Sequence, residues 1–224
     1  MSHPENTNLA ETFAGLTTSD AKVAHLAGDH FSKPASAERV SAAKAGLEKN
    51  GFKVHVVNTR ADAFETLKHL IPAGASIIGF ITYIKGQTPW NNIHGTIIAE
   101  KDAVKQAELR RKLSSTVDYY LTSMAAITED GKLVHGDLSG SKVEGVAFGA
   151  GTVIVVAGSN KIVKDQTEAF KRLHEHALPL ESARVRIAYG LPASAVSNMM
   201  VINQPYPFNK DRIHVVIVND ALGY

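Results

Sequence analysis

Two hydroxyl side chains, Thr122 and Ser123, directly follow the apolar stretch DYYL, which has the composition of a buried strand. In a parallel α/β sheet, ligands bind beyond the carboxyl ends of the strands, and these two residues fall at such an end. Their hydroxyl groups and the backbone N–H groups around them can bind a carboxylate or a phosphate. The alternative is that the hydroxyls only satisfy the polar groups of the strand end.

An acidic turn, Glu129-Asp130-Gly131, follows a few residues later. A carboxylate held against apolar walls has a raised pKa and can act as a general base, or it can attack an acyl group directly. The same residues are also typical of a plain hairpin, in which Gly131 supplies the positive φ. Glu129 is therefore the candidate catalytic carboxylate, with a solvated hairpin tip as the alternative. His135 is a second catalytic candidate if the hairpin folds over the same pocket.

The segment GDLSGSK, residues 136–142, is rich in glycine and precedes a predicted helix. Backbone N–H groups at a helix N-terminus attract anions, and Lys142 adds a positive charge. Asp137 can accept a hydrogen bond from a hydroxyl group of a sugar or a hydroxy acid. The spacing does not match a P-loop. The alternative is a helix cap by Ser139 or Ser141.

The segment AGSNKIV, residues 157–163, follows the most apolar stretch of the chain, TVIVV. Gly158 permits a close backbone approach, Asn160 tolerates the left-handed conformation, and Lys161 brings a cation to the strand end. Loops at strand ends carry function more often than the core does. Gly158 and Asn160 are therefore candidate substrate-binding residues and Lys161 a candidate catalytic residue, with a structural turn as the alternative.

A long irregular segment, residues 81–97, lies between two predicted elements. An aromatic ring, a cation and a histidine in such a loop are typical of a lid or a pocket wall. Solvated side chains and a local hydrophobic plug are the alternatives. The candidate substrate-binding residues of this segment are Thr82, Tyr83, Lys85, Trp90 and His94, and Gly79 at the end of the preceding strand is a further candidate.

Hydrophobic periodicity predicts the elements that position these residues. Helices are expected over residues 36–51, 59–72, 99–116, 141–151 and 164–179, the last one ending at Pro179. Strands are expected over residues 52–57, 75–80, 117–122, 152–158, 198–203 and 211–220, with a hairpin over 126–137. The first β-α-β order implies a parallel pair with a right-handed crossover. The whole pattern predicts an α/β fold with a mostly parallel sheet flanked by helices.

Composition limits the class of protein. The chain has 224 residues, with 44% hydrophobic and 21% charged residues, an ordinary globular balance. We predict a flexible N-terminal arm over residues 1–17 and a single domain over 18–224. The net charge of +2 comes without a basic stripe, so nucleic acid is not an expected partner.

Several kinds of site are excluded by what the sequence lacks. The chain contains no cysteine, so disulfides, thiolate nucleophiles and cysteine-based metal sites are ruled out. His174 and His176 do not suggest a metal site, because positions i and i+2 of a helix point about 200° apart. No signal-peptide pattern is seen, and no apolar run approaches the roughly 18 residues of a membrane span. A cytoplasmic protein that does not bind membranes is expected.

Three stretches resemble the LUD (lactate-utilisation) domain family, in its branch of stand-alone members: DYYLTSMAAITEDGKLV, VAFGAGTVIVVAGSNKIV and RIHVVIVNDALGY. The similarity runs from about residue 37 to the C-terminus. It implies a fold similar to that of sugar-phosphate isomerases and CoA transferases. Relatives of this kind occur beside iron–sulfur proteins of lactate oxidation. Glu129 stands where other members show an acid-Gly turn, which is similar to the turn that carries the nucleophile of CoA transferases.

This chain departs from the pattern of those relatives at two places. They commonly carry a cysteine-rich segment shortly before the last strands, whereas residues 186–210 here contain no cysteine. They also tend to show a Gly-Gly-Ser-like turn where this chain has Gly79-Phe80-Ile81-Thr82. Both changes fall in expected pocket loops, so this cysteine-free member is expected to take a different ligand.

We therefore expect an enzyme that binds a small anionic or polyhydroxylated metabolite at the strand ends. Its reaction would be an isomerisation, an enolisation or an acyl-type rearrangement without a metal or a redox cofactor. Glu129 would be the base or nucleophile, and the developing charge would be stabilised by Thr122, Ser123, Asn160, Lys161 and Lys142. The alternative is a non-catalytic metabolite-binding or accessory subunit of a lactate or organic-acid oxidation system. Whether the chain forms a homo-oligomer is left open.

Overall fold

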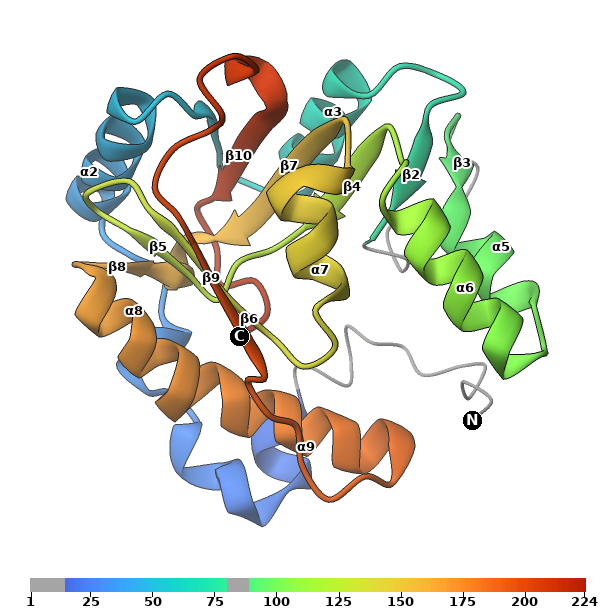
Figure 1. The fold of residues 1–224 in the computed structure, drawn as a ribbon. Helices are drawn as coiled ribbons and strands as arrows, with labels where there is room; N and C mark the ends of the chain where they lie inside the picture. Colours follow the sequence, from blue (N-terminus) through green and yellow to red (C-terminus); the bar gives the residue numbers. More distant parts are fainter. Residues whose placement is uncertain (1–14, 80–88) are drawn as a thin grey trace.

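The computed structural model describes residues 15–79 and 89–224, which form two β-sheets flanked by helices (Figure 1). Every neighbouring pair in the larger sheet is parallel, which confirms the predicted fold class. In spatial order its strands are β1 (Lys53–Val57), β10 (Ile213–Val218), β7 (Thr152–Gly158), β4 (Tyr119–Thr122), β2 (Ser76–Ile78) and β3 (Asn91–Asn92).

The prediction that the first two strands form a parallel pair is wrong. β1 and β2 lie in the same sheet, but β10, β7 and β4 stand between them. The very apolar strands β7 and β10 occupy the middle of the sheet, where both faces are covered, and so displace β2 toward the edge.

The smaller sheet is mixed. In spatial order it contains β8 (Ile162–Val163), β5 (Ala126–Thr128), β6 (Leu133–Asp137) and β9 (Asn198–Ile202). β5 and β6 form the predicted hairpin, whose Gly131 has φ +85°. β5 pairs with β8 in parallel, whereas β6 pairs with β9 antiparallel.

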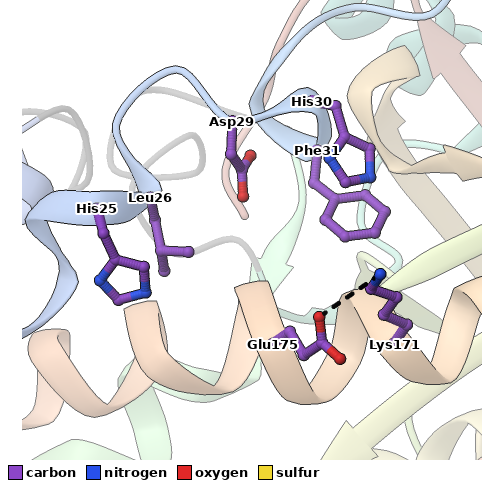
Figure 2. Close-up of a pocket in the computed structure, with 7 residues that line it drawn as sticks. All are labelled: His25, Leu26, Asp29, His30, Phe31, Lys171 and Glu175. Atoms are coloured by element: carbon purple, nitrogen blue, oxygen red, sulfur yellow. Dashed lines mark ion pairs between the residues drawn. The ribbon is translucent and has the colours of Figure 1, made fainter.

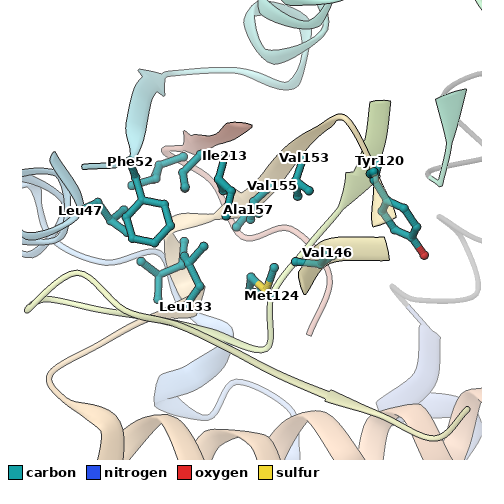
Figure 3. Packing of buried hydrophobic residues seen from close by; sticks show 14 of the residues in the cluster. Leu47, Phe52, Tyr120, Met124, Leu133, Val146, Val153, Val155, Ala157 and Ile213 are labelled. Carbon is teal, nitrogen blue, oxygen red and sulfur yellow. The ribbon is translucent and has the colours of Figure 1, made fainter. Parts of the chain in front are cut away.

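Helices and the smaller sheet cover the two faces of the larger sheet. Alternate residues of β7 point to opposite faces: Ile154 packs with α3 (Arg60–Leu70), whereas Val155 packs in the cluster that includes α2 (Ala37–Lys49) and the smaller sheet. Figure 3 shows part of this second cluster, which fills the space between the two sheets. The helices α5 (Ile93–Ala99) and α6 (Ala103–Ser114) lie beside the β2–β3 edge (Figure 1).

A long helical stretch supports the smaller sheet from its other side (Figure 1). It consists of α8 (Gln166–Arg172), a π-helical turn η5 (Leu173–Ala177) and α9 (Leu178–Tyr189). The prediction that Pro179 ends this helix is therefore wrong. A proline ring clashes with the carbonyl four residues earlier, and the widened π turn that precedes Pro179 allows the helix to continue.

The shorter helical segments join these layers. The α7 helix (Ser141–Glu144) continues into the π-helical η3 (Gly145–Gly149), as the sequence predicted for this region. The 3-10 helices are η1 (Ala21–Leu26), η2 (His30–Ser32), η4 (Ser159–Lys161) and η6 (Lys210–Arg212). Residues 15–19 are helical, and Leu16 is buried against α9. Residues 1–14 of the predicted arm lie outside the described residues.

Candidate active site

The candidate site lies where two neighbouring strands leave the larger sheet. β4 and β7 pair in parallel there, and the strands that follow them, β5 and β8, pair in parallel in the smaller sheet. The two linkers, residues 123–125 and 159–161, therefore run side by side, and we call this junction the seam. Their side chains meet across it, because Nζ of Lys161 donates a hydrogen bond of 3.0 Å to Oγ of Ser123.

Buried neighbours fix the position of Ser123. Thr122 is buried, and its hydroxyl donates a hydrogen bond of 3.2 Å to the backbone oxygen of Ser123. On the other side, Met124 is 1% exposed and packs in the core near Val146 (Figure 3). Ser123 itself is only half-buried. The residue is thus held by its neighbours and still keeps contact with solvent.

Lys161 is buried, with 5% of its surface exposed. Burial, reinforced by the positive charges of Arg172 and Lys142, lowers the pKa of Lys161 well below that of a solvated lysine. The lowered pKa favours the neutral amine over the ammonium, and a neutral amine can accept a proton. The seam therefore places a base beside a hydroxyl group.

Arg172 of α8 lies behind the seam and is fully buried. Its guanidinium donates hydrogen bonds to the backbone oxygens of Ala125 and Phe31, the latter at 3.4 Å. Its Nε has no partner among the described residues. Burial lowers the pKa of Arg172 to about 10, which still leaves it charged at neutral pH. Arg172 therefore ties the serine linker to α8 and supplies a fixed positive charge next to Lys161.

His135 of β6 stands next to the seam. The backbone N–H of Ala125 donates a hydrogen bond of 2.9 Å to the backbone oxygen of Val134. His135, the residue after Val134, therefore lies beside the linker that contains Ser123. His135 is 7% exposed, and neither ring nitrogen has a partner among the described residues. Burial, together with the charge of Lys142, lowers its pKa to about 4. The imidazole is therefore neutral at physiological pH, with two unused polar atoms.

The glycine-rich segment after β6 brings Asp137 and Lys142 to the outer side of His135. The Asp137 carboxylate accepts a hydrogen bond of 2.9 Å from the backbone N–H of Lys142, and another of 3.3 Å from that of Ser139. Lys142 is exposed, and its charge acts on both His135 and Lys161. The helix cap by Ser139 or Ser141 is not formed, because Gly140 is the N-cap of α7 and makes no side-chain cap bond; Ser139 Oγ accepts a hydrogen bond of 3.3 Å from the N–H of Ser141.

Gly158 and Asn160 lie under the C-terminal segment, residues 219–224. A Cβ at Gly158 would stand 2.4 Å from both the backbone nitrogen of Leu222 and Oδ1 of Asn160. Asn160 is 3% exposed, and its amide bonds the same segment. Gly158 thus permits a close backbone approach, as the sequence predicted. The backbone that approaches it belongs to residues 219–224 of the same chain.

Glu129 lies in a different environment from Lys161. Its carboxylate accepts a hydrogen bond of 2.6 Å from Nε of Arg39 on α2, and Glu168 lies 3.7 Å from the same guanidinium. The Gly131 turn rests on Gly46 of α2, where a Cβ on either glycine would clash with the backbone of the other segment. The structure therefore places the acidic turn as a contact between the hairpin and α2. The candidate residues that the structure brings together at the seam are Ser123, Lys161 and His135.

The candidates from residues 79–98 are dispersed. Gly79, with φ +100°, packs against Leu121 at the end of β2, where a Cβ would lie 1.8 Å from the Leu121 oxygen. Trp90 is buried on the α3 side of the larger sheet and donates to the backbone oxygen of Ile71 at 3.1 Å. His94 lies in the first turn of α5. The remaining candidates fall outside the described residues: Thr82, Tyr83 and Lys85.

Sequence reasoning missed Arg172 beside the seam and three further polar residues that join α9 to the C-terminal segment. The burial of Arg172 could have been predicted from the sequence, because Arg172 lies on the same face of its helix as the apolar residues Ala169 and Leu173. The others form a group in which Arg184 makes two hydrogen bonds, of 2.8 and 2.6 Å, to Glu181, and the Tyr224 hydroxyl donates to the same carboxylate. Tyr224 is far from Glu181 in sequence, so no local pattern could link them.

A surface pocket of about 470 Å³ lies on the other side of α8 (Figure 2). Near it, Asp29 accepts a hydrogen bond of 2.8 Å from His176, and Figure 2 shows the Lys171–Glu175 ion pair on the helix below. His174 is exposed whereas His176 is buried, so the two imidazoles do point apart. None of the predicted site residues lines this pocket, whose lining residues are His25, Leu26, Asp29, His30, Phe31, Lys171 and Glu175.

Within residues 15–79 and 89–224, no three histidine or acidic side chains are grouped so as to hold a metal ion. Among the helices of the same part of the chain, none is long and apolar enough to cross a membrane.

Comparisons with known proteins give one family and one related structure. The family described as LUD domain matches residues 40–218, which include both linkers of the seam. Among curated proteins, no sequence matches this chain significantly. A crystal structure of a DUF162 family protein from Deinococcus radiodurans is similar, with 14% sequence identity and a TM-score of 0.48, over 83% of this chain and 99% of that one.

Proposed function

The chain belongs to the LUD domain family, and from this premise we propose that it is an enzyme of acyl-type chemistry in which Ser123 is the nucleophile and Lys161 its general base. The observation that carries this proposal is the 3.0 Å contact between Lys161 Nζ and Ser123 Oγ. A nucleophile and its base work at about 2.6–3.2 Å, and serine–lysine pairs are an established variant of the serine–histidine arrangement.

The environment of each partner suits its role. A serine hydroxyl is a weak nucleophile unless a base removes its proton as it attacks. Lys161 can do so only when its amine is neutral, and burial together with the charges of Arg172 and Lys142 favours that form. Once protonated, the ammonium is stabilised by the negative charge that develops on the substrate.

The reaction then proceeds in two steps. Ser123 Oγ forms a bond to the acyl carbon while its proton passes to Lys161 Nζ. The bond to the leaving alcohol or thiol breaks, and the leaving group takes that proton, which leaves an acyl-serine. Water or another acceptor attacks the acyl carbon, Lys161 accepts its proton, and the proton returns to Ser123 as the acyl group departs.

His135 and Lys142 are the residues that would contact the substrate. The neutral imidazole of His135 has two unused polar atoms, so it can donate a hydrogen bond to a substrate oxygen. Lys142 is an exposed cation on the same side and favours a substrate that carries a negative charge. We therefore propose a small, cytoplasmic, anionic ester or thioester as the substrate class. Glu129 has no role in this scheme because Arg39 holds it elsewhere.

A second candidate function is metabolite binding without turnover. It is supported by the positive charges of Arg172 and Lys142 near Lys161, which would attract an organic acid. In that case Lys161 would become protonated when the anion binds, and Ser123 would only donate a hydrogen bond. Such a protein could serve as an accessory subunit of an organic-acid oxidation system.

Covalent labelling separates the two functions. The protein is incubated with a fluorophosphonate, which reacts with activated serine residues, and the adduct is located by peptide mass spectrometry. An enzyme should be labelled at Ser123, with no label on Ser123→Ala and a rate lower by roughly 10²-fold or more on Lys161→Met. An unlabelled wild-type protein that is stabilised against heat by small organic acids would favour the binding function instead.

A further inference from the structure

We propose that Asn160 is a positioning residue that holds the C-terminal segment, residues 219–224, over Lys161 and thereby keeps water away from its amine. This inference rests on the proposed function. Among the described residues, Asn160 is the side chain that bonds this segment through both of its amide atoms. The inference assigns a role to a segment that carries no nucleophile or base of its own.

Asn160 binds the segment at two successive residues. Its Oδ1 accepts a hydrogen bond of 3.1 Å from the backbone N–H of Leu222, and its Nδ2 donates one of 3.2 Å to the oxygen of Gly223. The side chain is buried, so neither bond competes strongly with water. An asparagine is suited to this task because it offers a donor and an acceptor on one rigid group.

Gly223 lies close to the amine of Lys161. A Cβ built on Gly223 would stand 3.7 Å from Nζ of Lys161, which is van der Waals contact. Gly223 also has φ +60°, a conformation that favours glycine. The backbone of the segment therefore passes beside the amine, on a side from which water would otherwise approach it.

The segment is fastened at both of its ends. At one end, the N–H of Asn219 donates to the oxygen of Val57 at 2.9 Å, and Arg60 pairs with Asp220 at 3.2 Å. At the other end, the Tyr224 hydroxyl donates to Glu181 on α9. Asn160 provides the attachment between these ends, next to the residue that matters for the chemistry.

Other groups also act on Lys161 and must be held constant in any test. The charged or titratable side chains whose fields reach it come from α7, β6, α8 and η5, and they are Lys142, His135, Arg172 and His176. None of them bonds residues 219–223 in the described part of the chain. A change confined to Asn160 therefore leaves these charges in place and alters the covering segment.

The variant Asn160→Ala removes both bonds, and two measurements follow its effect. Hydrogen exchange reports whether the Leu222 amide loses protection. Trace acetylation with acetic anhydride, read at Lys161 by mass spectrometry across a pH series, gives the accessibility and the pKa of that amine without any use of Ser123. We expect faster exchange at Leu222, faster acetylation, and a pKa of Lys161 that rises by about one unit or more as water reaches the amine.

Two further variants guard against a simple loss of folding. Tyr224→Phe removes only the hydroxyl that reaches Glu181, and it should produce changes in the same direction but smaller. Asn58→Ala removes an exposed hydrogen bond of 3.0 Å to the Asn219 side chain and should leave the acetylation profile of Lys161 unchanged.

Two results would overturn the inference. One is unchanged exchange at Leu222 in Asn160→Ala, since Asn160 would then not hold the segment. The other is faster exchange with an unchanged acetylation profile of Lys161, since the segment would then not control the amine. Failure of the proposed function looks different: Ser123 would remain unlabelled by the fluorophosphonate while the acetylation results still decide the role of Asn160.

Discussion

Arg39 of α2 donates a hydrogen bond of 2.6 Å to Glu129 at the tip of the β5–β6 hairpin. The two residues are 90 positions apart, and their ion pair joins the first long helix to the smaller sheet. Both side chains are partly exposed, at 38% and 28%. The acidic turn therefore contributes to the assembly of the fold, and its carboxylate pairs with α2 and not with the serine–lysine pair.

Replacement of Glu129 by glutamine should leave the chemistry intact. A glutamine keeps the shape of the side chain but loses the charge, and partly exposed ion pairs contribute about 1 kcal/mol or less. We expect a small decrease in the free energy of unfolding and an unchanged rate of fluorophosphonate labelling at Ser123. A loss of labelling of tenfold or more in a folded Glu129→Gln protein would restore the carboxylate as a catalytic candidate.

Gly46 should resist replacement by alanine although it lies inside a helix. A Cβ at this position would stand 2.3 Å from the backbone oxygen of Glu129, so the hairpin or the helix would have to move. We expect Gly46→Ala to destabilise the protein by roughly 2 kcal/mol or more in urea unfolding. Gly95 of α5 is the matched control, because a Cβ there meets nothing within 4 Å. Gly95→Ala should be neutral or stabilising by up to about 1 kcal/mol.

His135 should make the protein sensitive to acid. Its folded-state pKa of about 4 lies below the ordinary value of 6.5, so the unfolded chain binds a proton at a higher pH than the folded protein does. The stability that depends on the neutral imidazole is present above pH 6.5 and is lost as the pH falls toward 4. The loss should reach roughly 3 kcal/mol at its maximum.

A comparison with His135→Gln isolates this contribution from those of the other histidines. The difference in unfolding free energy between the wild type and the variant should change by a few kcal/mol between pH 7 and pH 4. A difference that stays constant over this range would show that His135 is solvated or already partnered in the folded protein.

Arg172 should influence the pH at which Ser123 reacts. Its positive charge, after burial, is the first cause that lowers the pKa of Lys161. In Arg172→Met that repulsion is absent, so the pKa of Lys161 should rise and the labelling of Ser123 should require a higher pH. The variant should also unfold more easily, since the carbonyl groups of Ala125 and Phe31 lose a buried donor.

The pH midpoint of labelling distinguishes this electrostatic effect from a general loss of structure. Arg111→Met, a change to an exposed arginine of α6, provides the control and should not move the midpoint. An unshifted midpoint in a folded Arg172→Met protein would mean that the guanidinium does not act on Lys161.

Local patterns predicted most of the elements, but the expectation of an irregular loop is wrong for residues 91–99, which form β3 and α5. Ser36 accepts a hydrogen bond from the N–H of Arg39 at the start of α2, and the Glu129–Gly131 turn closes the hairpin. Ser123 and Lys161 were both predicted to lie at strand ends, because a strand followed by polar residues marks the rim of a parallel sheet. These features depend on residues close together in the chain.

Long-range features could not be predicted in the same way. The chain forms two sheets because β4 is followed by β5 and β7 is followed by β8, and β5 and β8 pair in the smaller sheet. The residues of one linker do not show that the other linker lies beside it. The partner of Glu129 and the contact between Tyr224 and Glu181 join residues far apart in sequence. The continuation of the helix past Pro179 depends on a π turn that adapts to the layers packed around it.

The most direct test of the serine–lysine pair is pre-steady-state hydrolysis of p-nitrophenyl acetate near neutral pH, with the wild type, Ser123→Ala and Lys161→Arg compared. Lys161→Arg keeps a positive charge but removes the neutral amine. We predict a burst of nitrophenolate of about one equivalent per chain in the wild type, with an acetyl group on Ser123 in the quenched protein, and no burst in either variant. A burst of the same size in Ser123→Ala, or in Lys161→Arg, would contradict the account.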